Sequence, residues 1–146
     1  MYRRILVPLE NSPTDAHIVA HVRDLARHCA ASVVFIHVAD GWAARHINHL
    51  QLRESEEIRA DREYLERIAR ETTAAGLTAE AVLATGEPAK EIVLAAEREQ
   101  CDLIAMATHG HKLLGDVVYG SVANEVRHAT HVPVLLVRAS ATRGGV

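Results

Sequence analysis

The sequence has 146 residues, of which 49% are hydrophobic and 24% charged, so it predicts one ordinary folded domain and excludes a disordered chain. Aromatic residues make up only 3%, which argues against a single-strand nucleic-acid reader built on stacked bases. The formal net charge of -3 lacks the basic excess that binding of a phosphate backbone requires, so we expect no nucleic-acid partner.

The first two elements follow from a short apolar run and a helical period. Residues 4–7 form an apolar run closed by Pro8, which predicts a buried strand. A helix is predicted over residues 16–29, because its apolar residues recur at helical spacing. Ser12 is expected to cap this helix, with Pro13 at the favoured first helical position.

The middle of the chain continues the alternation of strands and helices. Residues 32–38 are apolar on both faces of a predicted strand, as in a parallel sheet covered on both sides. A long charged helix is predicted over residues 54–75, and Gly76 supplies its end. A weakly alternating strand is predicted over residues 78–84.

The last part of the chain predicts two more helices and two more strands. A helix begins around Pro88 and ends near Gln100, and a strand follows over residues 103–107. A second helix is predicted over residues 121–129, and a final strand over residues 134–137.

This order of elements predicts an α/β fold, a five-stranded parallel sheet with helices on both faces. We expect a single domain over residues 1–140, followed by a loose tail over residues 141–146. In open sheets of this kind, ligands bind beyond the carboxyl ends of the strands. Two such ends carry unusual residues, namely the segments 8–12 and 106–110.

The second segment leads into a candidate anion site. Gly120 and Ser121 come directly before the predicted helix, whose free backbone N–H groups and dipole favour a phosphate. Gly110 lets the backbone turn close to a ligand, and His111 is one of several basic residues between the two glycines. The same residues could serve only as a turn and a helix cap, and the spacing alone leaves that alternative open.

At this point the sequence resembles the universal stress protein family, from about residue 3 to residue 138. The segments that carry the resemblance are residues 5–12, 35–38, 102–106, 120–122 and 132–138. The ATP-binding branch of that family carries the pattern G-x2-G-x9-G-[ST], which Gly110, Gly120 and Ser121 match. Ala107 stands where the pattern has its first glycine, and Glu10 stands where family members usually have Asp.

The resemblance implies a Rossmann-like fold of the adenine nucleotide alpha hydrolase type that binds ATP, with AMP, ADP and cyclic AMP as alternative ligands. A divalent ion such as Mg²⁺ would be held through the phosphates. It also implies a homodimer that pairs the last strand, between Val132 and Val137, with its copy. The nucleotide-binding residues that it implies are Pro8, Leu9, Glu10, Val38, Met106, Ala107, Gly110, His111, Gly120, Ser121 and Val122.

Catalytic and metal-binding patterns are weak in this sequence. No nucleophile, base and orienting group stand at motif spacing, so we expect a nucleotide-binding stress-response or regulatory protein and no catalytic residues. His17 and His21 stand at a spacing that can bind metal, but surface histidines are the simpler interpretation. Two readings stay open beside this one: a nucleotide-free dimeric interaction module of the same family, and a slow ATPase on the same scaffold.

The expected location is the cytoplasm. The two cysteines are far apart and form no C-x-x-C pair, which fits free thiols in a reducing compartment. The apolar run at the amino terminus is too short for a signal peptide, and no stretch approaches the ~20 apolar residues of a membrane span.

Overall fold

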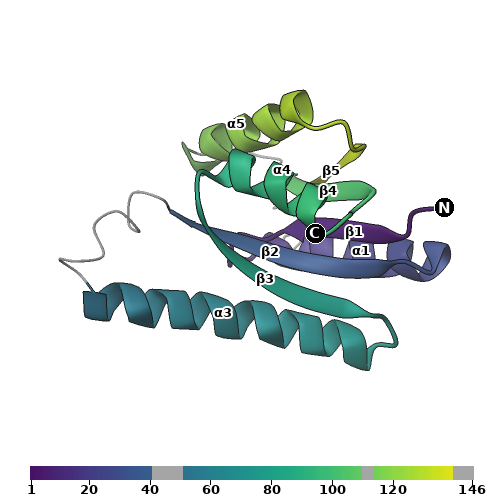
Figure 1. Ribbon diagram of the computed structural model, residues 1–146, viewed down its shortest axis with the longest axis horizontal. Helices are drawn as coiled ribbons and strands as arrows, with labels where there is room; N and C mark the ends of the chain where they lie inside the picture. The colour runs from purple at the N-terminus through teal and green to yellow at the C-terminus, as the bar shows by residue number, and fades with distance from the viewer. Residues whose placement is uncertain (41–50, 110–113, 140–146) are drawn as a thin grey trace, which may run out of the picture.

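A five-stranded sheet forms the centre of the molecule (Figure 1). The computed structural model describes residues 1–40, 51–109 and 114–139. The strands stand in the order β3-β2-β1-β4-β5, and every neighbouring pair is parallel. Their bounds are Arg4–Pro8 for β1, Ser32–Asp40 for β2, Ala79–Gly86 for β3, Leu103–His109 for β4 and Val134–Ala139 for β5.

Within the described residues, four helices cover the two faces of this sheet. Their bounds are Asp15–Cys29 for α1, Gln51–Ala74 for α3, Pro88–Arg98 for α4 and Leu114–Ala129 for α5. Helices α1 and α3 pack on one face, and α4 and α5 pack on the other. The predicted α/β fold, with a parallel sheet between helical layers, is therefore confirmed.

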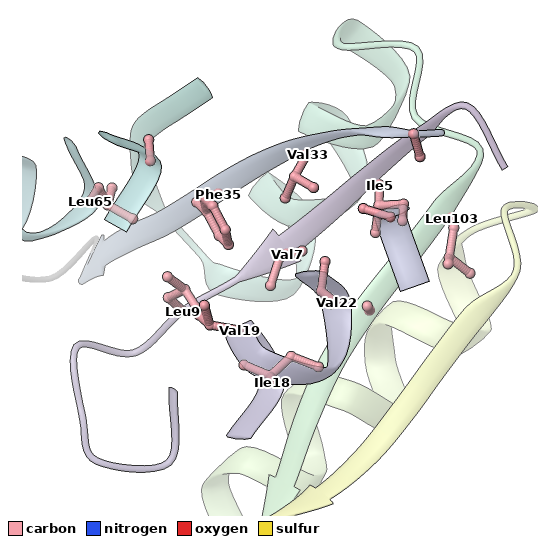
Figure 2. Close-up of a cluster of buried hydrophobic side chains, with 14 residues drawn as sticks. Ile5, Val7, Leu9, Ile18, Val19, Val22, Val33, Phe35, Leu65 and Leu103 are labelled. Carbon is pink, nitrogen blue, oxygen red and sulfur yellow. The ribbon is translucent and has the colours of Figure 1, made fainter. Parts of the chain in front are cut away.

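The strands form two cores because their side chains alternate between the two faces. Ile5 and Val7 of β1 belong to the core against α1 and α3, whereas Leu6 between them belongs to the core against α4 and α5. Figure 2 shows the first core, where Ile18 and Val22 of α1 meet the side chains of β1 and β2. Each of these five side chains is fully buried, as the predicted apolar runs require.

The start of α1 differs from the sequence prediction. The residue before the helix is Thr14, and neither its side chain nor that of Ser12 makes a capping bond to the helix. Ser12 and Pro13 instead belong to a turn ahead of the helix. Asp15, at the first helical position, bonds the preceding loop and thereby takes over the organising role expected of Ser12.

The start of α5 is also different. The helix begins at Leu114, so Gly120 and Ser121 lie within it and do not precede it. Glycine in a helix interior costs only about 1 kcal/mol, so Gly115 and Gly120 do not prevent the helix from starting earlier. The free N–H groups at the amino end of this helix therefore belong to its first turn, which starts at Leu114.

The remaining boundaries agree closely with the predictions. Gly76 lies in the turn directly after α3 and has a φ of 99°, a conformation that favours glycine. β5 lies at an edge of the sheet, as expected, and its Leu136 side chain is 44% exposed. None of the helices within the described residues has the length and apolar character needed to cross a membrane.

Candidate functional site at the carboxyl ends of the strands

A cavity of about 190 Å³ lies where β1, β2 and β4 end, beside α4 and α5. Its position beyond the carboxyl ends of parallel strands is the one where α/β sheets bind ligands. β1 lies between β2 and β4, and the chain leaves β1 on one side to form β2 and returns on the other to form β4. The lining residues are Pro8, Leu9, Glu10, Ile36, His37, Val38, Pro88, Ile92, Met106, Ala107 and Val122.

The cavity brings together seven of the eleven residues predicted to bind a nucleotide. These are Pro8, Leu9, Glu10, Val38, Met106, Ala107 and Val122. Gly110 and His111 lie outside the described residues. Ser121 is exposed and does not line the cavity, and its hydroxyl lies 3.3 Å from Glu125 Oε2, to which it donates.

Four lining residues were not predicted, namely Ile36, His37, Pro88 and Ile92. Ile36 and His37 come just before Val38 on the same strand, so their proximity was available from the sequence. Pro88 and Ile92 enter because α4 starts at the carboxyl end of β3 and passes over the sheet. Nothing in their residue types marks them as site residues.

Ala107 sits in an ordinary strand conformation. It lies within β4, pairs with Val137 of β5 and is absent from the described non-glycine residues with positive φ. An alanine in place of glycine would cost about 1–2 kcal/mol only if a left-handed conformation were required. The departure from the family pattern at this position therefore carries no backbone strain.

The loop after β1 is organised by a buried carboxylate. Asp15 is 3% exposed, and its two oxygens accept hydrogen bonds from the backbone N–H groups of Glu10, Asn11 and Ser12 at 3.1, 2.8 and 3.2 Å. The Tyr64 hydroxyl of α3 donates to Asp15 Oδ2 at 2.5 Å. A buried carboxylate is costly unless donors surround it, and here four donors do so.

A second set of contacts holds the same loop from β2 and α3. One ring nitrogen of His37, Nδ1, lies 2.8 Å from the carbonyl oxygen of Leu9, and the other, Nε2, lies 3.3 Å from Asp61 Oδ2. The side-chain amide of Asn11 donates to Asp61 Oδ1 at 3.1 Å. The residues on either side of Glu10 are thus tied to neighbouring elements.

Two further features define the electrostatics of this end of the molecule. The Thr14 hydroxyl donates to Glu10 Oε2 at 3.0 Å, which places a hydrogen-bonded carboxylate on the wall of the cavity. Burial, followed by the hydrogen bond to Asp15, raises the pKa of the Tyr64 hydroxyl well above its ordinary value. Tyr64 therefore remains a proton donor to Asp15 throughout the neutral range.

The arrangement offers binding chemistry. Apolar side chains from β2, α4, β4 and α5 line most of the cavity, a part that we call the apolar slot, and Glu10 adds an acceptor for hydroxyl groups. Within the described residues, no three histidine, cysteine or acidic side chains gather closely enough to hold a metal ion. His17 and His21 are exposed on α1, away from the residues that line the cavity.

Comparisons with known proteins identify one protein family over most of the chain. The model of the universal stress protein family matches residues 1–138. The solved structure of the universal stress protein MJ0577 of Methanocaldococcus jannaschii superposes with a TM-score of 0.79 at 30% identity, over 96% of this chain and 98% of that one.

Two more distant universal stress protein structures share the fold. One, in complex with cAMP, has a TM-score of 0.69 at 19% identity, and covers 95% of this chain and 98% of its own. The other, from Archaeoglobus fulgidus in complex with dAMP, has a TM-score of 0.66 at 20% identity, and covers 92% of this chain and 97% of its own. With the family match and the fold in agreement, the chain belongs to the universal stress protein family.

Proposed function

We propose that this protein binds an adenine nucleotide, with ATP as the first ligand to test, and acts as a nucleotide-dependent regulatory protein. The observation that carries the proposal is the cavity itself. Seven residues predicted from the sequence to bind a nucleotide come from three strands, the loop after β1 and one helix, yet they line one largely apolar cavity with a carboxylate on its wall. Relatives with the same fold are known in complex with cAMP and dAMP, which supports an adenine ligand.

The size of the cavity suits part of a nucleotide. Its volume of about 190 Å³ is below the range of about 300–1,000 Å³ that is usual for complete small-molecule sites. We therefore assign the base to the apolar slot, between Val38 and Met106, and the ribose hydroxyls to Glu10. The phosphates extend outward past Ala107 and Val122.

The phosphates would meet the amino end of α5. Its first turn, from Leu114, carries free N–H groups and the positive end of the helix dipole on the side of the sheet where β4 ends. Gly110 and His111 remain proposed phosphate contacts. Gly120 and Ser121 lie beyond the first turn of α5, so they would meet the phosphates through the small glycine and the serine hydroxyl and not through free backbone N–H groups. Mg²⁺ would enter with the phosphate oxygens, which it prefers together with water.

We also propose a homodimer, because β5 lies at an edge of the sheet and pairs on one side, with β4, among the described strands. Its Leu136 side chain is 44% exposed, and an apolar edge strand invites pairing with another chain. A two-fold axis beside β5 would pair each copy with the other through the same segment, between Val132 and Val137. This edge also keeps open the alternative of a dimeric interaction module without nucleotide.

Calorimetry with the purified protein tests the proposed function. ATP, ADP, AMP and cAMP are titrated separately, and mass spectrometry of the denatured protein identifies any nucleotide that co-purifies. Val122→Phe, which fills the slot from α5, should weaken binding by at least about tenfold. Leu94→Phe is the matched control, because Leu94 is 42% exposed on α4 and lies outside the cavity.

The possible outcomes separate the three functions. No heat with any adenine nucleotide and no co-purified nucleotide would reject nucleotide binding and leave the interaction module. Release of phosphate over many turnovers would favour the ATPase. Light scattering at micromolar protein concentration tests the dimer, and a monomeric mass would contradict it.

A further inference from the structure

The loop that carries Glu10 is held by residues from a helix that does not line the cavity. Asp15 binds three consecutive backbone N–H groups of this loop, from Glu10 to Ser12, and buries its carboxylate while doing so. Asn11, in the middle, has a φ of 64°, a left-handed conformation that is uncommon for residues other than glycine. A carboxylate that bonds this strained turn on both sides defines its shape.

Helix α3 contributes the second half of this arrangement. Asp61 and Tyr64 are three residues apart and so lie on one face of the helix. Tyr64 donates to Asp15, and Asp61 contacts both the side chain of Asn11 and the ring of His37. Neither Asp61 nor Tyr64 lines the cavity, so their contacts act on the loop and not on a ligand.

These contacts surround Glu10 on both sides. Before it, the carbonyl of Leu9 is bound by His37; after it, Asn11 and Ser12 are bound by Asp15. The backbone of Glu10 itself donates to Asp15, and its carboxylate accepts a bond from Thr14. The place of this carboxylate on the cavity wall therefore depends on where α3 holds the loop.

We propose that Asp15, Asp61 and Tyr64 are positioning residues that set the Glu10 carboxylate for recognition of the ribose hydroxyls. The inference rests on the proposed function, because it needs a nucleotide whose ribose meets Glu10. This positioning couples α3 to the nucleotide. A nucleotide that orders the loop stabilises the contacts between the loop and α3, and a loss of those contacts lowers nucleotide affinity by the same coupling free energy.

The experiment compares ATP with 2′,3′-dideoxy-ATP, which lacks both ribose hydroxyls. Wild-type protein should bind ATP about tenfold or more tightly, since the hydroxyls donate to a charged acceptor. Tyr64→Phe removes only the hydroxyl that donates to Asp15, and should bring this ratio down to about twofold while the affinity for the dideoxy nucleotide stays within about twofold of wild type. Tyr2→Phe is the matched control, because Tyr2 packs on the same core near the opposite end of β1.

Further variants keep the test decisive. Asp61→Asn removes the charge that binds Asn11 and His37, and should lower the same ratio even if Tyr64→Phe were poorly folded. In Glu10→Gln protein the ratio should already be low, and adding Tyr64→Phe should lower it no further, as expected for residues that act through one group. Thermal melts of each variant report folding separately.

The experiment distinguishes a failure of the proposed nucleotide binding from a failure of the positioning role. Wild-type protein that binds neither nucleotide would overturn the proposed function and this inference with it. A second outcome would overturn the positioning role alone. In it, wild-type protein discriminates the two nucleotides, but Tyr64→Phe and Asp61→Asn leave the affinity ratio unchanged because they weaken neither ligand or both equally. A loss of discrimination in Tyr2→Phe would also contradict it.

Discussion

The two ends of the sheet hold their strands together with polar contacts of different kinds. At the amino ends of the strands, Arg4 pairs with Glu80 and Glu99 at 3.2 and 3.0 Å, and its Nε donates to the Glu99 carbonyl at 2.8 Å. The Asp102 carboxylate there accepts bonds from the backbone N–H groups of Arg3 and Arg4. We call Arg4, Glu80, Glu99 and Asp102 the amino-end cluster.

At the carboxyl ends the contacts serve the loops instead. Asp15 is surrounded by backbone donors and by one tyrosine, and no basic side chain of the described residues is among its hydrogen-bond partners. The amino-end cluster joins long side chains of opposite charge across several elements, whereas the contacts around Asp15 fix one loop next to a cavity. The comparison indicates that the polar groups at the amino ends stabilise the fold, whereas those at the carboxyl ends shape the loop beside the candidate site.

Removal of the Arg4 side chain should have the largest effect. Arg4→Met keeps the aliphatic stem but removes the guanidinium that pairs with Glu99 and Glu80, and should lower the free energy of unfolding by about 2–3 kcal/mol. Nucleotide affinity should stay at the wild-type value, because the amino-end cluster lies at the other end of the strands. Urea denaturation and calorimetry measure the two quantities, and a parallel loss of affinity would contradict the separation of the two ends.

Acid should weaken the amino-end cluster to a smaller degree. Partial burial favours the neutral form of Asp102, but the backbone N–H groups of Arg4 and Arg3 outweigh it and hold the pKa of this carboxyl below its usual range. A lowered pKa in the folded state gives stability that is present above the unfolded pKa and is lost as the pH falls through the folded pKa.

The variant Asp102→Asn isolates this contribution. At pH 7 it should be less stable than wild type by about 1 kcal/mol, and the difference should shrink as the pH falls below about 4. Glu97→Gln, at an exposed carboxylate of α4, is the control and should follow the wild-type pH profile. A difference between Asp102→Asn and wild type that stays constant down to pH 2 would exclude the hydrogen-bonded carboxylate as its cause.

The smallest expected effect is at the carboxyl end. Ala107→Gly restores the glycine of the family pattern, but Ala107 already has strand conformation and pairs with Val137. The change should lower the free energy of unfolding by about 0.5–1 kcal/mol, the cost of glycine in a strand, and leave ATP affinity within about twofold. A tenfold gain in affinity, measured by calorimetry, would show that the Ala107 methyl obstructs the ligand.

The fold was predictable because β1, β2, β4 and β5 are short apolar runs between polar turns, and a buried parallel sheet needs such runs. β3, at an edge of the sheet, alternates only weakly. The place of the site, at the ends of β1 and β4, was predictable because parallel strands bring their carboxyl ends to the same side. The individual nucleotide-binding residues came from the resemblance to the universal stress protein family. The contact between Tyr64 and Asp15 joins residues 49 positions apart, and no periodic pattern reports a pairing of that kind.

The predicted start of α5, at residue 121, was wrong for a local reason. Gly115 and Gly120 were interpreted as parts of a loop, yet glycine weakens a helix only slightly and does not forbid it. Ser12 was assigned as a cap because serine and proline before an apolar period are typical of a helix start. The carboxylate of Asp15, three residues later, reaches back to the N–H of Ser12 and holds it in the turn instead.

The end of β1 at Pro8 has a consequence for how the cavity arises. Pro8 stands beside Ile36, and β2 continues beyond that level to Asp40, while β4 continues to His109. The central strand is thus shorter than both neighbours, and the cavity lies in the notch between them. Its depth is determined by strand lengths more than by the volumes of individual side chains, so the notch can persist while the residues that line it change and the ligand preference changes with them.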